Sequence, residues 1–408
     1  MRRTDRQSGQ IMPVVLASLA IGIAAIFISH RVSRAVTQES VVVNAADAAA
    51  YSGASWTARR LNLIAYTNRA LVANHIAVGH LTAYVSWLRY VDQGADRIAN
   101  YTRYIPYVGA ATTAAERIVA TALVGSEQTA GLMIRGFDLL HRLMALTQLD
   151  ARRGLRPARV DEVMHRVARQ YGESLEVNQR EPMDSIPQPY QAAMDGLLIG
   201  RRVSAYLKLQ RTRAGRDRGY FARLVSRTID QDPDLERWMR GSRSRATARF
   251  GSGGRTWDLS LPLTVRFRKQ GNTHQPPLPD AGGWRSADRL QVGFFNLGKF
   301  EWGSWATIAG GRADADRLSG GYRGVHHYTR LRERQADNEL LRVPALVTAP
   351  LDRMGDQRAI NAHLSMASVR YHVPARCRRR CPGPDNPASL FNPYWEAGLV
   401  TPSVDGLP

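Results

Sequence analysis

The sequence predicts an α+β protein in which a single transmembrane helix continues into a long helical region, followed by a mixed domain with an antiparallel sheet. Three observations predict this class. An uninterrupted apolar run occupies residues 11–28, a stretch with helical periodicity and no proline follows it, and polar–apolar alternation begins near residue 255. The 408 residues are 44% hydrophobic, which provides enough apolar surface for a folded core.

Residues 11–30 are predicted to form the transmembrane helix, after a short basic cytoplasmic tail at residues 1–10. The eighteen uncharged residues 11–28 would extend roughly 27 Å, close to the hydrocarbon thickness of a bilayer. A proline at position 13 fits the first helical turn, where a missing N–H costs nothing. The side chains expected to anchor this helix in lipid are Ile11, Pro13, Leu16, Leu19, Ile23, Ile26 and Ile28.

Two alternatives remain open for this segment. The apolar core of a signal peptide is shorter, but Ser33-Arg34-Ala35 places small residues where a signal peptidase reads, so cleavage after Ala35 is a second hypothesis. A buried helix of a soluble protein would need apolar partners on all sides, because the run has no polar face. Basic residues lie on both sides of the run, and their slight excess before it favours a cytoplasmic amino terminus.

Residues 31–177 are predicted to be an extended helical region. Pro106 and Gly109 interrupt its periodicity, and further helices are expected at about 111–149 and 159–172. Nine of the twelve residues 44–55 are Ala, Ser or Gly, which either permit close packing against a partner helix or another part of the chain, or simply reflect helix propensity. The expected packing positions are Ala45, Ala46, Ala49, Ser52 and Gly53.

Aromatic residues repeat at a spacing of three near the end of the first long helix. Such a stripe is more typical of a buried core than of a ligand platform. We therefore expect these side chains to be covered: Trp87, Tyr90, Tyr101, Tyr104 and Tyr107.

Residues 178–254 are predicted to be a linker followed by a basic helical segment. Three prolines within residues 178–190 indicate a loop, and a helical pattern rich in arginine resumes from about 190 to 228. We interpret these arginines as a solvated helix face, because aromatic residues are not regularly interleaved with them.

Residues 255–408 are predicted to form a mixed α+β domain outside the cytoplasm. Leu259, Leu261 and Leu263 alternate with other residues as in a strand, and similar patterns suggest an antiparallel sheet over about 255–375. The terminal segment SLFNPYWEAGLV carries several aromatic residues, so we expect it to dock onto the domain and to be ordered.

The chain has two cysteines, Cys377 and Cys381. In an oxidising compartment they can close a small disulfide loop, which the chain-entropy relation values at about 2 kcal/mol. A zinc site with His363 and His372 is less favoured, because the spacing matches no common zinc pattern.

The formal net charge of +21 is uneven along the chain, with +5 up to residue 150 and +16 beyond it. A cationic surface attracts polyanions such as DNA, anionic glycans or phospholipid headgroups. Only three of the 56 basic residues are lysines, a ratio that also fits a GC-rich genome. An exported basic binding module for DNA or anionic envelope polymers is therefore the alternative function, against a plain solvated surface.

Motifs of common catalytic and nucleotide sites do not occur in the sequence. We find no GxxxxGK[ST] phosphate loop, no GxSxG elbow and no HExxH pair. His326 and His327 beside Tyr328 are the best candidates for acid–base chemistry, but adjacent histidines project differently on any regular element. The sequence thus predicts a protein that is not an enzyme and that holds no cofactor or metal.

The first 90 residues resemble the amino-terminal region of TadG-like pilus-assembly proteins, the minor pilin-like components of tight-adherence (Tad, or Flp) pilus systems. The resemblance depends on Gly9-Gln10 at the entry to one apolar helix, on the run Asn44 to Ala50, and on the stretch Asn62 to Asn74. The segment FNPYW at 391–395 is similar to longer members. The match covers about a fifth of the chain.

This resemblance implies a non-enzymatic envelope protein, anchored by one span in the bacterial inner membrane, with its amino terminus cytoplasmic and its bulk periplasmic or extracellular. Its expected partners are other Tad/Flp pilus components, and its expected role is support of pilus assembly, adhesion or secretion. True prepilins carry glutamate five residues after the glycine, whereas Val14 follows Gly9 at that distance here. The resemblance therefore implies a retained anchor rather than cleavage by a prepilin peptidase.

Overall fold

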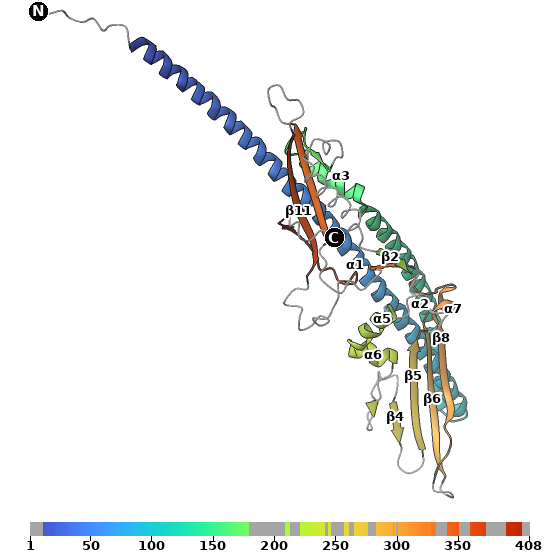
Figure 1. The fold of residues 1–408 in the computed structure, drawn as a ribbon. Coiled ribbons are helices and arrows are strands. Elements are labelled where there is room, and N and C mark those ends of the chain that lie inside the picture. Colours follow the sequence, from blue (N-terminus) through green and yellow to red (C-terminus); the bar gives the residue numbers. More distant parts are fainter. Residues whose placement is uncertain are drawn as a thin grey trace, which may run out of the picture.

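The structure, a computed structural model, describes residues 11–178, 209–212, 221–240, 244–245, 257–260, 265–275, 283–296, 298, 301–325, 327–331, 341–350, 360–372 and 389–401. The predicted basic tail, both cysteines and His326 lie outside these ranges. The chain is elongated, with one long helix along its axis and sheets packed beside it (Figure 1).

Helix α1 (Ile11–Thr102) is continuous over 92 residues. At 1.5 Å per residue it extends about 140 Å. The residues from Met12 to Ser40 are exposed, whereas buried positions begin at Val42 and recur as far as Ala99. We call residues 11–40 the shaft and residues 41–102 the spine. The shaft projects free of the rest of the chain, and the spine is its uninterrupted continuation into the body (Figure 1).

Helices α2 (Val108–Gly154) and α3 (Pro157–Ala168) follow the spine back toward the shaft. The turn before α2 holds Tyr107 at φ 62°, and it brings Gly109 so close to the backbone that a Cβ there would lie 2.6 Å from the carbonyl oxygen of Arg103. At the other end of α2, Trp56 Nε1 donates to the carbonyl oxygen of Gly154 over 2.8 Å. The helical hairpin is thus fixed at both ends.

A four-stranded antiparallel sheet covers the part of the spine next to the shaft. Its order is β1 (Glu176–Val177), β10 (Leu341–Pro350), β11 (Ile360–Tyr371) and β12 (Trp395–Val400). One core joins this sheet to α1 and α3, because buried residues between Val42 and Ile64 pack with Val347, Val369 and Met164.

A second sheet covers the end of the spine farther from the shaft. It follows the order β3 (Ser244–Arg245), β4 (Trp257–Ser260), β5 (Val265–His274), β6 (Arg285–Asn296) and β7 (Glu301–Trp302), and β8 (Ala306–Asp314) also pairs with β6. Its pairs are antiparallel except β3 with β4. A Cβ at Gly311 would lie 2.1 Å from the carbonyl oxygen of Ser86, so β8 touches the backbone of α1 directly.

Between the two sheets lie the remaining elements: β2 (Leu209–Thr212) paired with β9 (Tyr328–Leu331), α5 (Phe221–Asp230), α6 (Pro233–Arg240) and α7 (Ala315–Ser319). A second core joins them to α1 through Leu71, Val78, Phe221, Met239 and Tyr322. Asp314 caps α7, since its side chain accepts a hydrogen bond from the N–H of Asp316 over 3.1 Å.

The predicted combination of helices with antiparallel sheet is confirmed, and α2 and α3 lie where helices were expected. The helical pattern from about 190 to 228 is wrong at residues 209–212, which form a strand because β9 pairs with them. The helical region and the later mixed region also share both cores. The expected division at residues 178 and 255 therefore does not separate independent cores.

Candidate functional site

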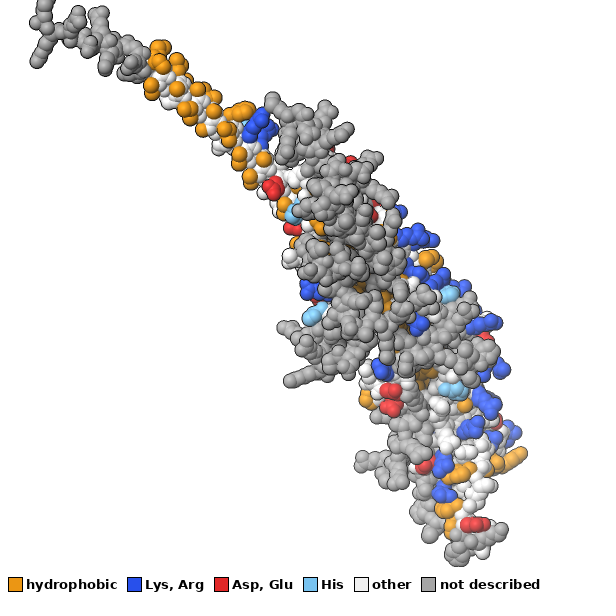
Figure 2. All heavy atoms as spheres, viewed as in Figure 1, with side chains coloured by type: hydrophobic (Ala, Val, Ile, Leu, Met, Phe, Trp, Pro, Cys, Tyr) orange, Lys and Arg blue, Asp and Glu red, His pale blue; other side chains and the backbone are white. Residues whose placement is uncertain are grey.

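From Met12 to Ile28 the shaft is apolar on all its sides. Among the described residues, α1 is the one helix with a stretch long and apolar enough to cross a membrane. That stretch is not buried against other described residues. Figure 2 shows it as a band of hydrophobic side chains that ends in charged groups before the body begins. Five of the predicted anchor residues are 57% to 72% exposed: Leu16, Leu19, Ile23, Ile26 and Ile28.

A polar collar separates this apolar band from the body. It includes Arg31, Arg34 and Glu39, all exposed, and the guanidinium of Arg31 lies 4.8 Å from the ring centroid of Phe27. The first buried residue, Val42, comes 13 residues after Ser29, about 20 Å along the helix. Ala35, the candidate cleavage position, lies within this exposed collar, and α1 is helical on both sides of it.

The small residues 44–55 pack inside the protein. Ala45, Ala46 and Ala49 have no exposed surface, and a Cβ at Gly53 would meet the side chain of Met164 at 2.8 Å. Ser52 is half-buried and donates to the carbonyl oxygen of Ala48. Of the two packing alternatives for this segment, packing against another part of the same chain holds for its buried face, because the first sheet and α3 cover it.

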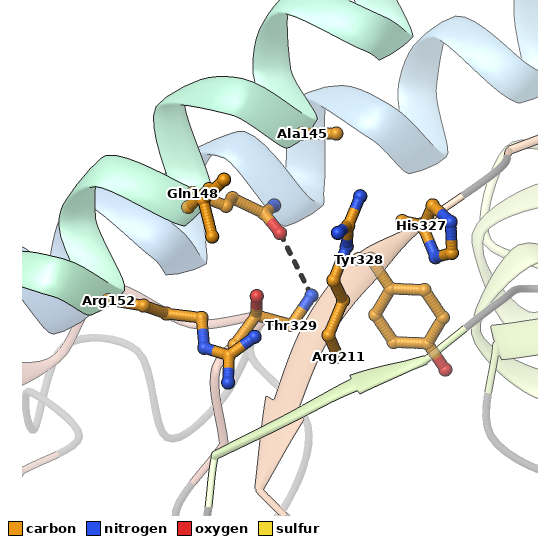
Figure 3. Close-up of a pocket in the computed structure, with 8 residues that line it drawn as sticks. Ala145, Gln148, Arg152, Arg211, His327, Tyr328 and Thr329 are labelled. Carbon is orange, nitrogen blue, oxygen red and sulfur yellow. Dashed lines mark hydrogen bonds between the residues drawn. The ribbon is translucent and has the colours of Figure 1, made fainter.

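A buried amide network joins both long helices to β9 and the terminal segment. Gln148 on α2 accepts from the N–H of Thr329 over 2.8 Å and donates to Asn68 Oδ1 over 2.8 Å (Figure 3). Asn68 in turn donates to the carbonyl oxygens of Thr329 and Leu390, each over 2.7 Å. The crevice in Figure 3 is too narrow to admit a water molecule, so this network is structural rather than a ligand site.

The terminal segment docks onto the mixed region, as predicted, with β12 paired to β11, and it also contacts the spine. The Asn62 side chain donates to the carbonyl oxygen of Trp395 over 2.9 Å and accepts from its N–H over 3.0 Å. Phe391 and Trp395 are each 4% exposed. Asn62 and Asn68 thus both hold the body to the helix.

A buried histidine lies in the second core. His75 Nδ1 is 2.7 Å from the hydroxyl of Tyr322, and its Nε2 faces the side-chain amide of Gln275. Burial, with His141 nearby, lowers the pKa of His75 from 6.5 to about 3, because a charged imidazole would lose its hydration there. Burial also raises the pKa of Tyr322 well above its usual value, with Asp138 as a second cause.

A buried ion pair lies under the second sheet. Lys269 Nζ and Asp288 Oδ1 are 2.5 Å apart, both side chains are almost fully covered, and Ser86 on α1 donates to Asp288 Oδ2 over 2.6 Å. Neither residue was predicted as a site from the sequence. A signal existed, because Lys269, Gly271 and Thr273 alternate on the inward face of β5.

A ladder of arginine and tryptophan side chains occupies part of the second sheet. The guanidinium of Arg266 lies 3.6 Å from the ring centroid of Trp302, and that of Arg268 lies 4.3 Å from Trp305. All four are half-exposed. Arginine side chains and aromatic rings can contact the phosphates and bases of single-stranded nucleic acid. This ladder is therefore the structural candidate for polyanion binding.

The predicted burial of the aromatic stripe is wrong for its last three tyrosines. Tyr101, Tyr104 and Tyr107, at the turn between α1 and α2, are 84%, 87% and 93% exposed. Trp87 and Tyr90 are half-buried.

Within the described residues, no group of three or more His, Cys, Asp or Glu side chains could hold a metal ion. His327 borders the crevice of Figure 3, while its sequence neighbour His326 is outside the described part of the chain. Comparison with protein-family models, with curated proteins and with solved structures finds no match to this chain.

Proposed function

We propose that this protein is a non-enzymatic component of the bacterial envelope, held in the inner membrane by its shaft, with its body in the periplasm or outside the cell. The single observation that carries the proposal is the shaft: an apolar helix that projects free and continues without a break into the spine. Water would not stabilise such a helix, whereas a bilayer or a bundle of similar helices would.

The more specific proposal is a role in assembly of a Tad/Flp pilus, as a minor pilin-like component that supports adhesion or secretion. It is supported by the resemblance of the first 90 residues to TadG-like proteins and by the firm attachment of the body to α1. The body is joined to α1 by two cores and by amides at Asn62 and Asn68, so a displacement of the shaft would carry the body with it.

Membrane anchoring is tested by placing charge in the shaft. Each arginine near the bilayer centre costs about 2.5–3.5 kcal/mol on the insertion scale, so L19R with I23R should release the protein from membranes washed with alkaline carbonate. The matched control is Y51R with Y66R, two exposed spine residues outside the shaft. Retention of the shaft variant in the membrane pellet would contradict the anchor.

The pilus role is tested by crosslinking in the native cell and co-purification of this chain. Tad-type secretion components should be recovered with it. Recovery of none, under conditions that capture a known pair of such components, would contradict the role while leaving the anchor intact.

A second candidate is an exported module that binds DNA or anionic envelope polymers. The arginine–tryptophan ladder favours it, and counterion release would make binding fall steeply with salt. The purified protein should retain single-stranded DNA at low salt, and R266Q with R268Q should weaken retention more than R59Q with R69Q, two exposed arginines on the spine. No retention at low salt would remove this candidate.

A further inference from the structure

One face of α2 carries an apolar stripe that the described part of the chain leaves uncovered. Its members are spaced alternately by four and three residues over 36 residues of helix, and all of them are exposed. We call this set the α2 stripe: Ala111, Ala115, Ile118, Ala122, Gly125, Thr129, Leu132, Gly136, Leu139, Leu143 and Leu146. The other face of α2 packs on the body through Ala130, Ile134, His141 and Gln148.

The period of the stripe is that of a coiled coil. A spacing of four and three repeats every seven residues, whereas a straight helix drifts by about 20° per heptad. An apolar face that keeps a strict heptad spacing over five repeats is typical of a helix that supercoils with a second helix. Leu132, Leu139 and Leu146 occupy successive positions of one kind, like the d positions of a two-stranded zipper.

The stripe and its border expose as much apolar surface as one side of a stable interface. Seven large side chains are 42% to 70% exposed: Ile118, Leu132, Met133, Leu139, Leu140, Leu143 and Leu146. Together they expose roughly 700 Å², close to the about 800 Å² that each partner buries in a standard interface. Soluble monomers rarely expose a contiguous apolar patch of this size without a function.

The small residues of the stripe leave room for a helix to approach. A Cβ at Gly125 or Gly136 would meet nothing within 4 Å, so none of the described elements occupies the space above them. Glycine in the middle of an exposed helix costs about 1 kcal/mol relative to alanine. Close contact with another backbone is a physical reason to keep it there.

The charges beside the stripe favour a second copy of this chain as the occupant. The flanking basic residues are Arg135, which donates to the carbonyl oxygen of Ser319, and Arg142, which pairs with Asp138 over 2.7 Å. In a parallel pair in register, each arginine faces the residue five positions later on the other copy. Arg135 therefore faces Leu140, and Arg142 faces Thr147. No like charges meet, and no acidic partner is required.

We propose that the α2 stripe is the interface of a parallel homodimer. The orientation, but not the interface, rests on the proposed anchor, because two shafts inserted in the same membrane must point the same way. The leucine-rich half of the stripe then packs nearer the membrane, and the small residues allow the helices to converge farther out.

The test is disulfide trapping in native membranes, in a background with C377S and C381S. Leu139→Cys and Leu146→Cys should each give a covalent dimer of this chain under mild oxidation, because zipper d positions bring their Cβ atoms within disulfide reach. The matched control is Val124→Cys, which is 56% exposed on α2 but lies off the stripe. It should remain monomeric.

A second arm removes the interface without touching the core. L139D with L143D should reduce dimer, read by crosslinking and by mass in detergent, to the background level, while V124D leaves it unchanged. All three positions are exposed, so the melting of the body should not change. A monomer in every assay, an adduct with a different protein, or binding of the stripe to lipid vesicles would each overturn the proposal. Since anchoring is read separately by carbonate extraction, its failure and that of the dimer are distinguishable.

Discussion

The shaft and the spine are two parts of one helix, and they differ in what covers them. In the shaft, large apolar side chains lie on every side and stay exposed, as at Leu19 and Ile26. In the spine, burial follows one face and begins with small residues such as Ala45 and Ala49, which have no exposed surface. The helix is continuous through both because its local sequence holds no proline between Pro13 and Pro106.

The difference shows how side-chain size is matched to the surroundings. A neighbouring element can lie close to a helix only where the side chains of the helix are small. Gly53 and Gly79 allow contacts that a Cβ would prevent. Lipid or loosely packed helices place no such limit, so the shaft carries Ile, Leu and Phe with open space around Gly22. The same helix thus carries large side chains where it is exposed and small ones where it is close-packed.

The largest expected effect comes from breaking the ion pair that the spine shares with the second sheet. Asp288→Ala leaves the ammonium of Lys269 buried without its carboxylate, which should cost about 3–5 kcal/mol of unfolding free energy. The measurement is urea unfolding of the full chain in detergent, followed by tryptophan fluorescence.

Two variants bracket that result. Ser18→Ala removes a hydroxyl of the shaft that bonds only within its own helix turn, so it should change the unfolding free energy of the body by less than about 0.5 kcal/mol. Lys269→Met combined with Asp288→Leu should be less destabilised than Asp288→Ala. An Asp288→Ala protein as stable as the parent would show that the pair is not buried as described.

The next effect compares two glycines in the same helix. Gly53→Leu would drive its side chain into Met164 and Val343, and overpacking of this kind should cost up to about 3 kcal/mol. Gly22→Leu has nothing within 4 Å and should leave the body unchanged, while making the shaft more apolar. Both variants are compared by thermal melting in detergent. Equal shifts in Tm would contradict the distinction between shaft and spine.

Hydropathy and periodicity were sufficient to predict the shaft, the long helices and the antiparallel sheet, because these features are written in neighbouring residues. The covering of the spine could not be predicted, since it depends on residues far along the chain: Asn62 bonds Trp395, and Gly311 touches Ser86. The tyrosines at the hairpin turn illustrate the same limit. Their spacing resembles that of a core, but these three side chains are 84% to 93% exposed.

The candidate sites divide in the same way. The shaft was visible as an apolar run, whereas the ion pair required the register of β5 with β6 to bring Lys269 near Asp288. The local pattern of Leu209–Thr212 predicts a helix, and only the pairing with β9 makes this segment a strand. In each case the missing information is which distant segment lies alongside.

The smallest expected effect concerns pH and again applies to the spine alone. The pKa of His75 is lowered from 6.5 to about 3 in the folded chain. As the pH falls, the unfolded chain therefore binds a proton at His75 near pH 6.5, whereas the folded chain binds it only near pH 3. The contribution is fully present above pH 6.5 and is lost as the pH falls toward 3, and at pH 5 the loss amounts to about 2 kcal/mol. Urea unfolding at pH 7 and pH 5 should show this decrease, and His75→Gln should flatten it, because glutamine does not titrate. Carboxylates contribute equally to both proteins, so the comparison isolates His75. An unchanged decrease in His75→Gln would mean that water reaches the second core and that the spine is less tightly covered there than the structure shows.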